Sequence, residues 1–273
     1  MAKNPKSQWE TITPKRAVEY LESNTRNRKV RARTVSFYAR HIAEGEWEPN
    51  GESIIFAEDG TLLDGQHRLL ACVEAGKSFK TLVVRGCSND AFLTIDQSIP
   101  RSAGDIVGLS GQAHANRKAA AARVILRVLE AEPKGIRPQL STKSSHKEVL
   151  DCVQQYEALL NDGCVVVRND DGTTICRPPA VFTGCYVLFA RKNRKKADEF
   201  FSLLTTGEGL SKNHPIMKLR GTLIVAATMP NVKRKKSWVL ALTIKAWNFF
   251  LQGKSVGNLK FSDKESWPKI RAR

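Results

Sequence analysis

Residues 53–76 constrain the fold of this chain more than any other stretch, and they read SIIFAEDGTLLDGQHRLLACVEAG. An apolar run at residues 54–56 meets a turn at Asp59-Gly60, and a second apolar pair follows at residues 62 and 63. The sequence DGQHR then comes directly before a helical pattern of apolar residues that ends at Gly76. This order predicts two short strands and a helix, with DGQHR where the second strand gives way to the helix.

The residues of this corner are suited to binding phosphate. The first turn of a helix directs backbone N–H groups and the positive end of the helix dipole outward. Gly65 lets the backbone approach a ligand closely, and Arg68 can bind two phosphate oxygens at once. Asp64 offers an oxygen ligand for Mg²⁺, and His67 offers an imidazole that titrates near neutral pH. The alternative is that Asp64 caps the helix and His67 packs in the core.

Two polar segments before the corner are candidate neighbours of it. Residues 24–33, NTRNRKVRAR, form a basic loop without an acidic residue, which either follows phosphates or is a solvated turn between two helices. Glu52 begins the first strand, where it is within reach of a ligand at the corner or simply faces solvent. Residues 1–24 predict a polar tail followed by a short helix that Thr13 caps and Pro14 opens.

The composition describes a globular protein without a membrane span. The 273 residues are 41% hydrophobic, and the mean hydropathy is −0.34. No apolar run approaches the roughly 18 residues that a membrane helix needs, and the N-terminus lacks a signal-peptide core. The six cysteines form no CxxC pair, so we expect reduced thiols and a cytoplasmic protein.

Positive charge is concentrated in the last third of the chain. Residues 181–273 have 19 Lys and Arg against 5 Asp and Glu, a net charge of +14, whereas residues 1–180 have 25 against 22, a net charge of +3. Such a field favours DNA as a partner, with an anionic membrane or a solubilising surface as alternatives. Two basic runs at helix junctions are the candidate DNA-binding residues. They are Arg191, Lys192, Arg194, Lys195 and Lys196 in the first run, and Lys233, Arg234, Lys235 and Lys236 in the second.

The second half of the chain predicts mainly helices. The stretch 145–160 reads as one helix that opens with a capping box of Ser145 and Glu148, and residues 164–167 and 173–176 suggest a small hairpin. Residues 237–251 give the clearest amphipathic pattern, in which Trp247 is expected to pack in the core. We therefore expect an α+β fold, with a small mixed sheet and helices in residues 1–110 and an all-α basic domain in residues 111–273.

With this order of features, residues 1–110 resemble the ParB/sulfiredoxin superfamily, and in particular its phage and prophage members, the ParB-like nucleases with a DGQHR motif. The shared order is the Asn- and Arg-rich loop, a helix at 34–44, a strand pair, DGQHR opening a helix that ends at Gly76, and a strand at 82–85. ParB proteins have a Gly-Glu-Arg-Arg type sequence at this corner and bind nucleotide phosphates there. Free-serine kinases of the superfamily use a similar Asp-Gly-His-His-Arg sequence in phosphoryl transfer. This chain departs from ParB at residues 66–68 and shows no clear helix-turn-helix after residue 110, so a chromosome-partition clamp is not implied.

The resemblance implies that the protein binds ATP or CTP, with Mg²⁺, and transfers a phosphoryl group. The implied catalytic residues are Asp64, which is also the metal ligand, His67 and Glu52. The implied phosphate-binding residues are Gly65, Gln66, Arg68, Asn24, Arg26 and Arg28. One alternative is a metal-dependent nuclease that adds Asp96 to the ligands, and another is a non-catalytic, nucleotide-switched protein that binds DNA or modulates the host. DNA is the expected macromolecular partner, a membrane is not, a homodimer is compatible with the sequence, and a phage-encoded protein would act in the bacterial cytoplasm.

Overall fold

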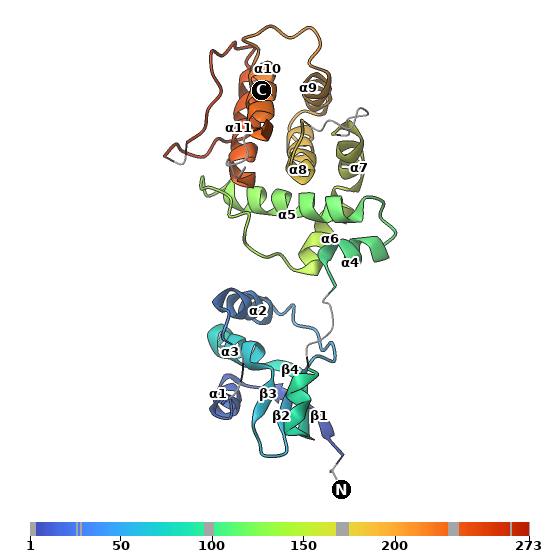
Figure 1. Ribbon diagram of the computed structural model, residues 1–273, viewed down its shortest axis with the longest axis vertical. Helices are drawn as coiled ribbons and strands as arrows, with labels where there is room; N and C mark the ends of the chain where they lie inside the picture. The colour runs from blue at the N-terminus through green and yellow to red at the C-terminus, as the bar shows by residue number, and fades with distance from the viewer. Residues whose placement is uncertain are drawn as a thin grey trace. The chain divides into compact units, whose positions relative to one another are not determined.

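The structure is a computed structural model that describes residues 4–25, 27, 29–95, 101–167, 175–228, 235–262 and 264–272. The chain divides into two compact units, Met1–Ile99 and Pro100–Arg273, which we call unit 1 and unit 2 (Figure 1). Among the described residues, the strands all lie in unit 1, and the regular structure of unit 2 is helical. The predicted α+β class is confirmed. The division lies before α4 (Ala103–Leu109), whereas the sequence suggested a boundary at residue 110.

Unit 1 contains a small mixed sheet with helices packed on it. Its strands are β1 (Lys6–Ile12), β2 (Ser53–Ala57), β3 (Leu62–Asp64) and β4 (Phe79–Cys87), and its helices are α1 (Pro14–Glu22), α2 (Ala32–Glu44), α3 (Gln66–Ala75) and the short 3₁₀ helix η1 (Asn89–Leu93). The strand order is β1-β4-β2-β3, in which β2 and β4 are parallel and the outer pairs are antiparallel. Helix α3 packs against both α1 and α2, as Figure 1 shows.

Local signals place the helices of unit 1 where the sequence predicts them. The Thr13 side chain accepts a hydrogen bond from the Arg16 N–H at the start of α1, with Pro14 in the first turn. Gly45 and Gly76 end α2 and α3 in the left-handed conformation, which glycine adopts at little cost. The core lies between sheet and helices and includes Ile54 and Val83 from the central strands. This packing fixes the corner between β3 and α3.

Strand β1 is the main correction to the sequence analysis of unit 1. Residues 6–12 were expected to be a polar tail, but they pair with β4 along their whole length, with Trp9 opposite Leu82. The strand is mostly exposed, so it has little apolar signal of its own. It forms because β4 offers unpaired backbone groups at the edge of the sheet, and such groups favour pairing with another strand.

Unit 2 is a bundle built around one helix that is buried from its third residue to its end. After α4, its helices are α5 (Ala115–Ala131), α6 (His146–Gln155), α7 (Glu157–Val166), α8 (Pro179–Ala190), α9 (Arg194–Thr206), α10 (Pro215–Thr228) and α11 (Lys236–Leu251). Every residue of α8 from Val181 to Ala190 is buried, and the helix packs against α5, α7, α9 and α11. Phe189 of α8 stacks on Trp247 of α11 with ring centroids 4.5 Å apart, which confirms the predicted core position of Trp247.

Two predictions in the middle of unit 2 are wrong. The single helix expected over 145–160 is two helices, because Tyr156 has a non-helical backbone conformation between α6 and α7. The hairpin is also wrong, because residues 164–166 belong to α7; residues 173 and 174 of its expected second arm lie outside the described residues. The signal was present in the sequence, since Leu160, Gly163 and Cys164 recur at helical spacing and are buried.

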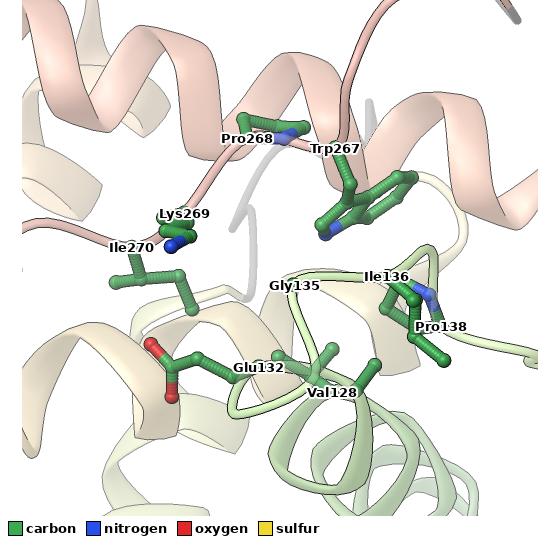
Figure 2. Close-up of a pocket in the computed structure, with 10 residues that line it drawn as sticks. Val128, Glu132, Gly135, Ile136, Pro138, Trp267, Pro268, Lys269 and Ile270 are labelled. Carbon is green, nitrogen blue, oxygen red and sulfur yellow. The ribbon is translucent and has the colours of Figure 1, made fainter.

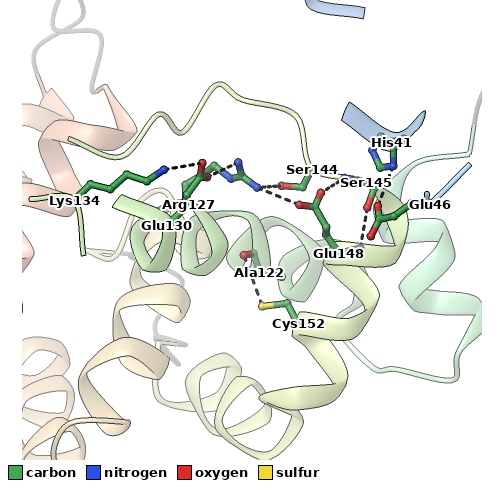
Figure 3. Close-up of polar contacts among 10 residues, drawn as sticks. All are labelled: His41, Glu46, Ala122, Arg127, Glu130, Lys134, Ser144, Ser145, Glu148 and Cys152. Carbon is green, nitrogen blue, oxygen red and sulfur yellow. Dashed lines mark hydrogen bonds and ion pairs between the residues drawn. The ribbon is translucent and has the colours of Figure 1, made fainter. Parts of the chain in front are cut away.

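A polar cluster joins α5 to the start of α6 (Figure 3). The predicted capping box is confirmed: the Glu148 N–H donates to Ser145 Oγ at 2.9 Å, and the Ser145 N–H donates to Glu148 Oε2 at 2.6 Å. Arg127 is 5% exposed, and its guanidinium contacts Glu130 at 2.7 Å, Ser144 at 3.2 Å and Glu148 at 3.6 Å. No helix in the described part of the chain combines the length and the apolar character that crossing a membrane requires.

Candidate phosphate-binding site

The DGQHR sequence lies where the structure changes from strand to helix in unit 1. Asp64 is the last residue of β3, and α3 begins at Gln66. Gly65 between them has φ +106°, and a Cβ atom on it would lie 2.9 Å from Ile54 Cγ1. This backbone conformation and the close approach of β2 both require glycine. The tight turn brings the side chains of residues 64–68 next to the start of β2.

Arg68 binds the two carboxylates of the predicted site. Arg68 is 7% exposed, and its Nη2 donates to Asp64 Oδ2 at 2.7 Å and to the Ser53 carbonyl oxygen at 2.8 Å. Nη1 contacts Glu52 Oε2 at 3.3 Å. Arg68 therefore brings Asp64 and Glu52 together at the corner and orients both, and a phosphate would compete with them for its guanidinium.

The two carboxylates remain open to solvent on their outer sides. The Asp64 side chain is 20% exposed and the Glu52 side chain is 68% exposed. Mg²⁺ is commonly bound by one or two carboxylates together with the phosphates of a substrate, so this pair fits that mode of binding. Within the described residues, no group of three His, Cys, Asp or Glu side chains gathers as a metal site. Asp96, a candidate ligand for a nuclease, lies outside the described residues.

Gln66 and His67 hold the basic loop against the corner. The Asn24 side-chain amide donates to Gln66 Oε1 at 3.3 Å, and the backbone N–H of Arg31 donates to His67 Nε2 at 3.1 Å. Asn27, which the sequence analysis did not single out, donates to Asn24 Oδ1 at 2.6 Å and to the Leu62 carbonyl oxygen at 2.7 Å. These bonds attach both ends of the described loop to β3 and α3.

The geometry gives His67 a definite orientation. Its imidazole is 6% exposed, and Nε2 accepts a hydrogen bond, so a neutral imidazole has its proton on Nδ1. An Nε2 atom that accepts the Arg31 N–H can take up a proton only if that bond opens. The arrangement thus favours a positioning role for His67, and its predicted part in proton transfer stays a prediction.

The loop presents exposed cations. Lys29, Arg31 and Arg33 are exposed, and among the described residues their side chains have no ion-pair partner. Arg26 and Arg28, both predicted to bind phosphate, lie outside the described residues. Beside the loop is an open apolar groove of about 390 Å³. Its lining comes from α1, α3, the start of α2 and the loop before it: Val18, Leu21, Val30, Ala32, Val35, Leu70, Val73 and Glu74.

The single cysteine of α3 is a core residue. Cys72 Sγ lies 3.4 Å from the Ile12 carbonyl oxygen and 3.2 Å from the Lys77 carbonyl oxygen, and its single S–H can donate to either. Burial raises the pKa of Cys72 to about 11, so the thiol stays protonated at neutral pH. Cys72 stabilises the contact of α3 with the sheet and is no candidate nucleophile.

In unit 2, the first predicted DNA-binding run is largely paired with acids. Lys192 contacts Glu132 at 3.6 Å, and Lys196 contacts Glu199 at 2.8 Å. Arg194 contacts both Asp162 and Asp198 at 3.0 Å. The remaining two differ: Arg191 lies over the Tyr156 ring, whereas Lys195 is exposed and has no acidic partner among the described residues.

The described part of the second run, Lys235 and Lys236, lies at the far end of α11 from the first run. Lys233 and Arg234 are outside the described residues, and Lys235 and Lys236 are exposed at the start of α11. Lys196 lies 5.3 Å from the ring of Phe250 near the end of that helix. Because each helical residue adds 1.5 Å, Lys236 and Lys196 are separated by about 20 Å along α11. The described residues of the two predicted runs therefore do not form one patch.

Comparisons of the chain with protein-family models, with curated proteins and with solved structures find no match. The resemblance of residues 1–110 to the ParB/sulfiredoxin superfamily therefore rests on the order of sequence features, and it stays a prediction.

Proposed function

We propose that unit 1 binds the phosphates of a nucleoside triphosphate, ATP or CTP, at the DGQHR corner and transfers a phosphoryl group with the help of Mg²⁺. One observation carries this proposal: Gln66 and His67 fasten the basic loop to the corner, while Lys29, Arg31 and Arg33 on that loop have no acidic partner among the described residues. Because hydrogen bonds through its backbone and side-chain amides hold the loop against the corner, the cations of the loop are already positioned to bind an anion.

Such an arrangement favours binding because the loop loses its conformational freedom when the protein folds, before any ligand binds. A flexible basic loop would lose conformational entropy when it closed on a phosphate, whereas this loop is already held by four hydrogen bonds. The apolar groove next to Val30 and Ala32 adds a surface for an uncharged part of the same ligand. A nucleotide combines such a part with a chain of phosphates, and this supports a nucleotide over inorganic phosphate.

The corner has the groups that phosphoryl transfer needs. That reaction depends mainly on positioning and on neutralising phosphate charge. Asp64 and Glu52 would hold Mg²⁺, which would supply part of that charge when bound. Glu52 is the more exposed carboxylate and would accept the proton of an incoming hydroxyl group, while Arg68 keeps both carboxylates oriented. His67 would position the loop through its bond to Arg31.

A non-catalytic nucleotide switch is the second candidate, and one observation favours it. Because Arg68 binds both Asp64 and Glu52, part of their charge is already neutralised, which lowers their affinity for a metal ion. For unit 2 we propose DNA as the partner, because its described surface includes unpaired cations such as Lys195 and Lys236.

The test uses the full chain with ATP or CTP labelled at the γ-phosphate, Mg²⁺ and duplex DNA. Three products are followed: free phosphate, labelled acceptor and cleaved DNA. We expect turnover of nucleotide that is lost in Asp64→Asn and Glu52→Gln and retained in Glu58→Gln, a matched change of an exposed glutamate at the β2–β3 turn.

Each other outcome supports a different function. DNA cleavage without nucleotide would support a nuclease and overturn phosphoryl transfer. Nucleotide binding by calorimetry without any labelled product would support the switch. No binding of either nucleotide would overturn the proposal as a whole.

A further inference from the structure

The end of the chain lies along α11 and is fixed there by its backbone. Trp247 Nε1 donates to the Arg271 carbonyl oxygen at 3.0 Å, and the Asn248 side-chain amide donates to the Lys269 carbonyl oxygen at 2.8 Å. The Arg271 N–H in turn donates to Asn248 Oδ1 at 3.0 Å. Figure 1 shows this last segment running beside the helix. Residues 269–271 therefore have a defined place near the C-terminal end of α11.

The side chains of this segment point in alternating directions. Ile270 is 8% exposed and belongs to the core of unit 2, whereas Lys269 and Arg271 are exposed. This alternation is what an extended chain gives, because neighbouring side chains project to opposite sides. Within the described part of the chain, neither Lys269 nor Arg271 has an acidic partner. Both backbone position and side-chain direction thus present these cations to solvent.

Two other basic segments reach the same end of α11. Lys254 follows the helix, where its N–H donates to the Phe249 carbonyl oxygen at 3.1 Å, and Lys196 lies over the ring of Phe250. Lys192 contacts Glu132, which lines a small pocket together with Lys269 (Figure 2). That pocket, of about 10 Å³, has room for about one water molecule, so the residues around it are close neighbours.

We infer that these segments form one surface that binds the phosphate backbone of duplex DNA. We call it the α11 basic surface, and its members are Lys192, Lys195, Lys196, Lys254, Lys269 and Arg271. The inference rests on the proposed DNA partner of unit 2, and it adds three cations, Lys254, Lys269 and Arg271, that lie outside both basic runs of the sequence.

Charge explains how this surface binds DNA. Lys195, Lys254, Lys269 and Arg271 are exposed and lack an acidic partner among the described residues, so they contact phosphates without breaking an ion pair. Lys192 and Lys196 have acidic partners, but exposed ion pairs contribute about 0–1 kcal/mol, so phosphates compete with them. Each phosphate contact releases counterions from the DNA, and this release drives binding at low salt.

The basic segments 191–196 and 252–272 expose no large apolar side chain among their described residues, which favours DNA over a membrane as the partner. A protein that lies on a membrane inserts apolar side chains beside its cations. The large apolar residues that are exposed in the described structure include Leu109, Val165 and Ile224, and none of them lies within residues 191–196 or 252–272. One further exposed apolar residue, Ile136, lines the small pocket beside Lys269. Apart from this single side chain, the surface has the cations of a polyanion site without the apolar side chains that a membrane site inserts.

The test measures binding of the full chain to a labelled duplex of about 20 base pairs by fluorescence anisotropy over a range of salt. The variant Lys254→Gln/Lys269→Gln/Arg271→Gln removes three side chains of the surface and leaves its backbone bonds in place. The control Lys6→Gln/Lys15→Gln/Lys80→Gln removes the same charge from exposed positions of unit 1. We expect the magnitude of the slope of log affinity against log salt to fall by about 3 in the first variant, with at least a tenfold loss of affinity, and to change by less than about 1 in the control.

Failure of the inference and failure of the proposed partner give different results. If the wild-type chain binds DNA and the two variants lose affinity equally, the α11 basic surface is not the site. If the wild-type chain does not bind DNA, the DNA partner itself is wrong. Binding to vesicles of anionic lipid that the first variant loses, with no binding to DNA, would overturn both in favour of a membrane surface.

Discussion

Gly65 is the residue on which the geometry of the corner depends most. Its φ of +106° is unfavourable for any residue with a Cβ atom, and that atom would also meet Ile54 at 2.9 Å. We expect Gly65→Ala to destabilise unit 1 by roughly 3 kcal/mol, the sum of backbone strain and overpacking. Gly60→Ala is the matched control, because Gly60 has φ +84° and open space around it, and it should cost about 1 kcal/mol.

Hydrogen exchange measured by mass spectrometry on peptides of unit 1 checks this prediction. Global exchange of β2 and β4 should become faster in Gly65→Ala than in Gly60→Ala, while peptides of unit 2 stay unchanged. Equal effects of the two substitutions would show that the contact with Ile54 contributes nothing.

His67 can be tested for positioning against proton transfer. A glutamine side chain offers an oxygen that can accept the Arg31 N–H, whereas alanine cannot. We expect His67→Ala to lower nucleotide affinity about tenfold, because the loss of a buried hydrogen bond and of packing loosens the loop. His67→Gln should retain most of the affinity and the turnover. Equal loss of turnover in both variants, with affinity kept in His67→Gln, would instead identify His67 as the proton carrier.

For single residues, the sequence predicts the secondary-structure element in which a residue lies better than the residues with which its side chain bonds. The glycine before a helical pattern was enough to place DGQHR at a strand–helix corner. The sequence also indicates the loop 24–33 as a neighbour of the corner, but not which of its residues bond to Gln66 and His67, because Asn24 and Arg31 are 42 and 36 residues away along the chain. Short polar side chains such as Asn27 give no periodic signal, so only the folded loop shows which of them make contacts.

Strand β1 is joined to α1 and β4 by a polar cluster as well as by the sheet. The Tyr20 hydroxyl donates to Glu10 Oε2 at 2.7 Å, and Arg85 Nη1 donates to Glu10 Oε1 at 2.6 Å. Desolvation alone would raise the pKa of Glu10, but the hydrogen bonds from Arg85 and Tyr20 outweigh it and hold this pKa below its ordinary value of 4.5. The ionised form of Glu10 therefore stabilises unit 1.

The sign of this shift predicts how the element responds to acid. A lowered pKa contributes stability that is complete above the unfolded pKa, near 4.5, and is lost as the pH falls through the lower pKa of the folded state. We expect Glu10→Gln to lower the stability of unit 1 at pH 7 by about 1 kcal/mol, since the cluster is partly exposed and water screens it. The variant should also lose less stability than the wild type between neutral pH and the acid range.

Urea unfolding at pH 7 and at about pH 3, followed by exchange of β1 and β4 peptides, measures this difference. If the stability of the wild-type chain and that of the Glu10→Gln variant fall in parallel as the pH is lowered, protonation of Glu10 is not the cause of the loss of stability in acid. Glu58→Gln, at an exposed turn, is the control for a change of net charge.

Helices with a periodic apolar pattern were the predictable elements. Helices α1, α2, α6 and α11 begin close to the residues that the sequence indicates, because their apolar faces are local features, and so are the side-chain caps of α1 and α6. Strand β1 and the break at Tyr156 were not predicted. The first depends on β4, which lies more than 60 residues further along the chain, and the second depends on packing among α5, α6 and α7.

In the whole molecule, charge and candidate chemistry lie in different units. Residues 1–99 have 14 Lys and Arg against 13 Asp and Glu, a net charge of +1, whereas residues 100–273 have 30 against 14, a net charge of +16. Composition alone predicts this asymmetry, since it needs no fold. Folding determines which cations stay available, because ion pairs occupy most of the run at 191–196 while Lys254, Lys269 and Arg271 remain unpaired among the described residues.

This separation predicts that the two proposed functions can be removed one at a time. Asp64→Asn changes one carboxylate in the nearly neutral unit, so we expect it to abolish nucleotide turnover and to leave the affinity for duplex DNA within about twofold of the wild type. The triple variant at Lys254, Lys269 and Arg271 should lose DNA affinity and keep nucleotide affinity. Calorimetry with nucleotide and anisotropy with DNA, measured on the same preparations at one salt concentration, give both quantities. If Asp64→Asn loses DNA affinity as strongly as the triple variant does, DNA binds at the DGQHR corner itself, and the positive field of unit 2 has some other purpose.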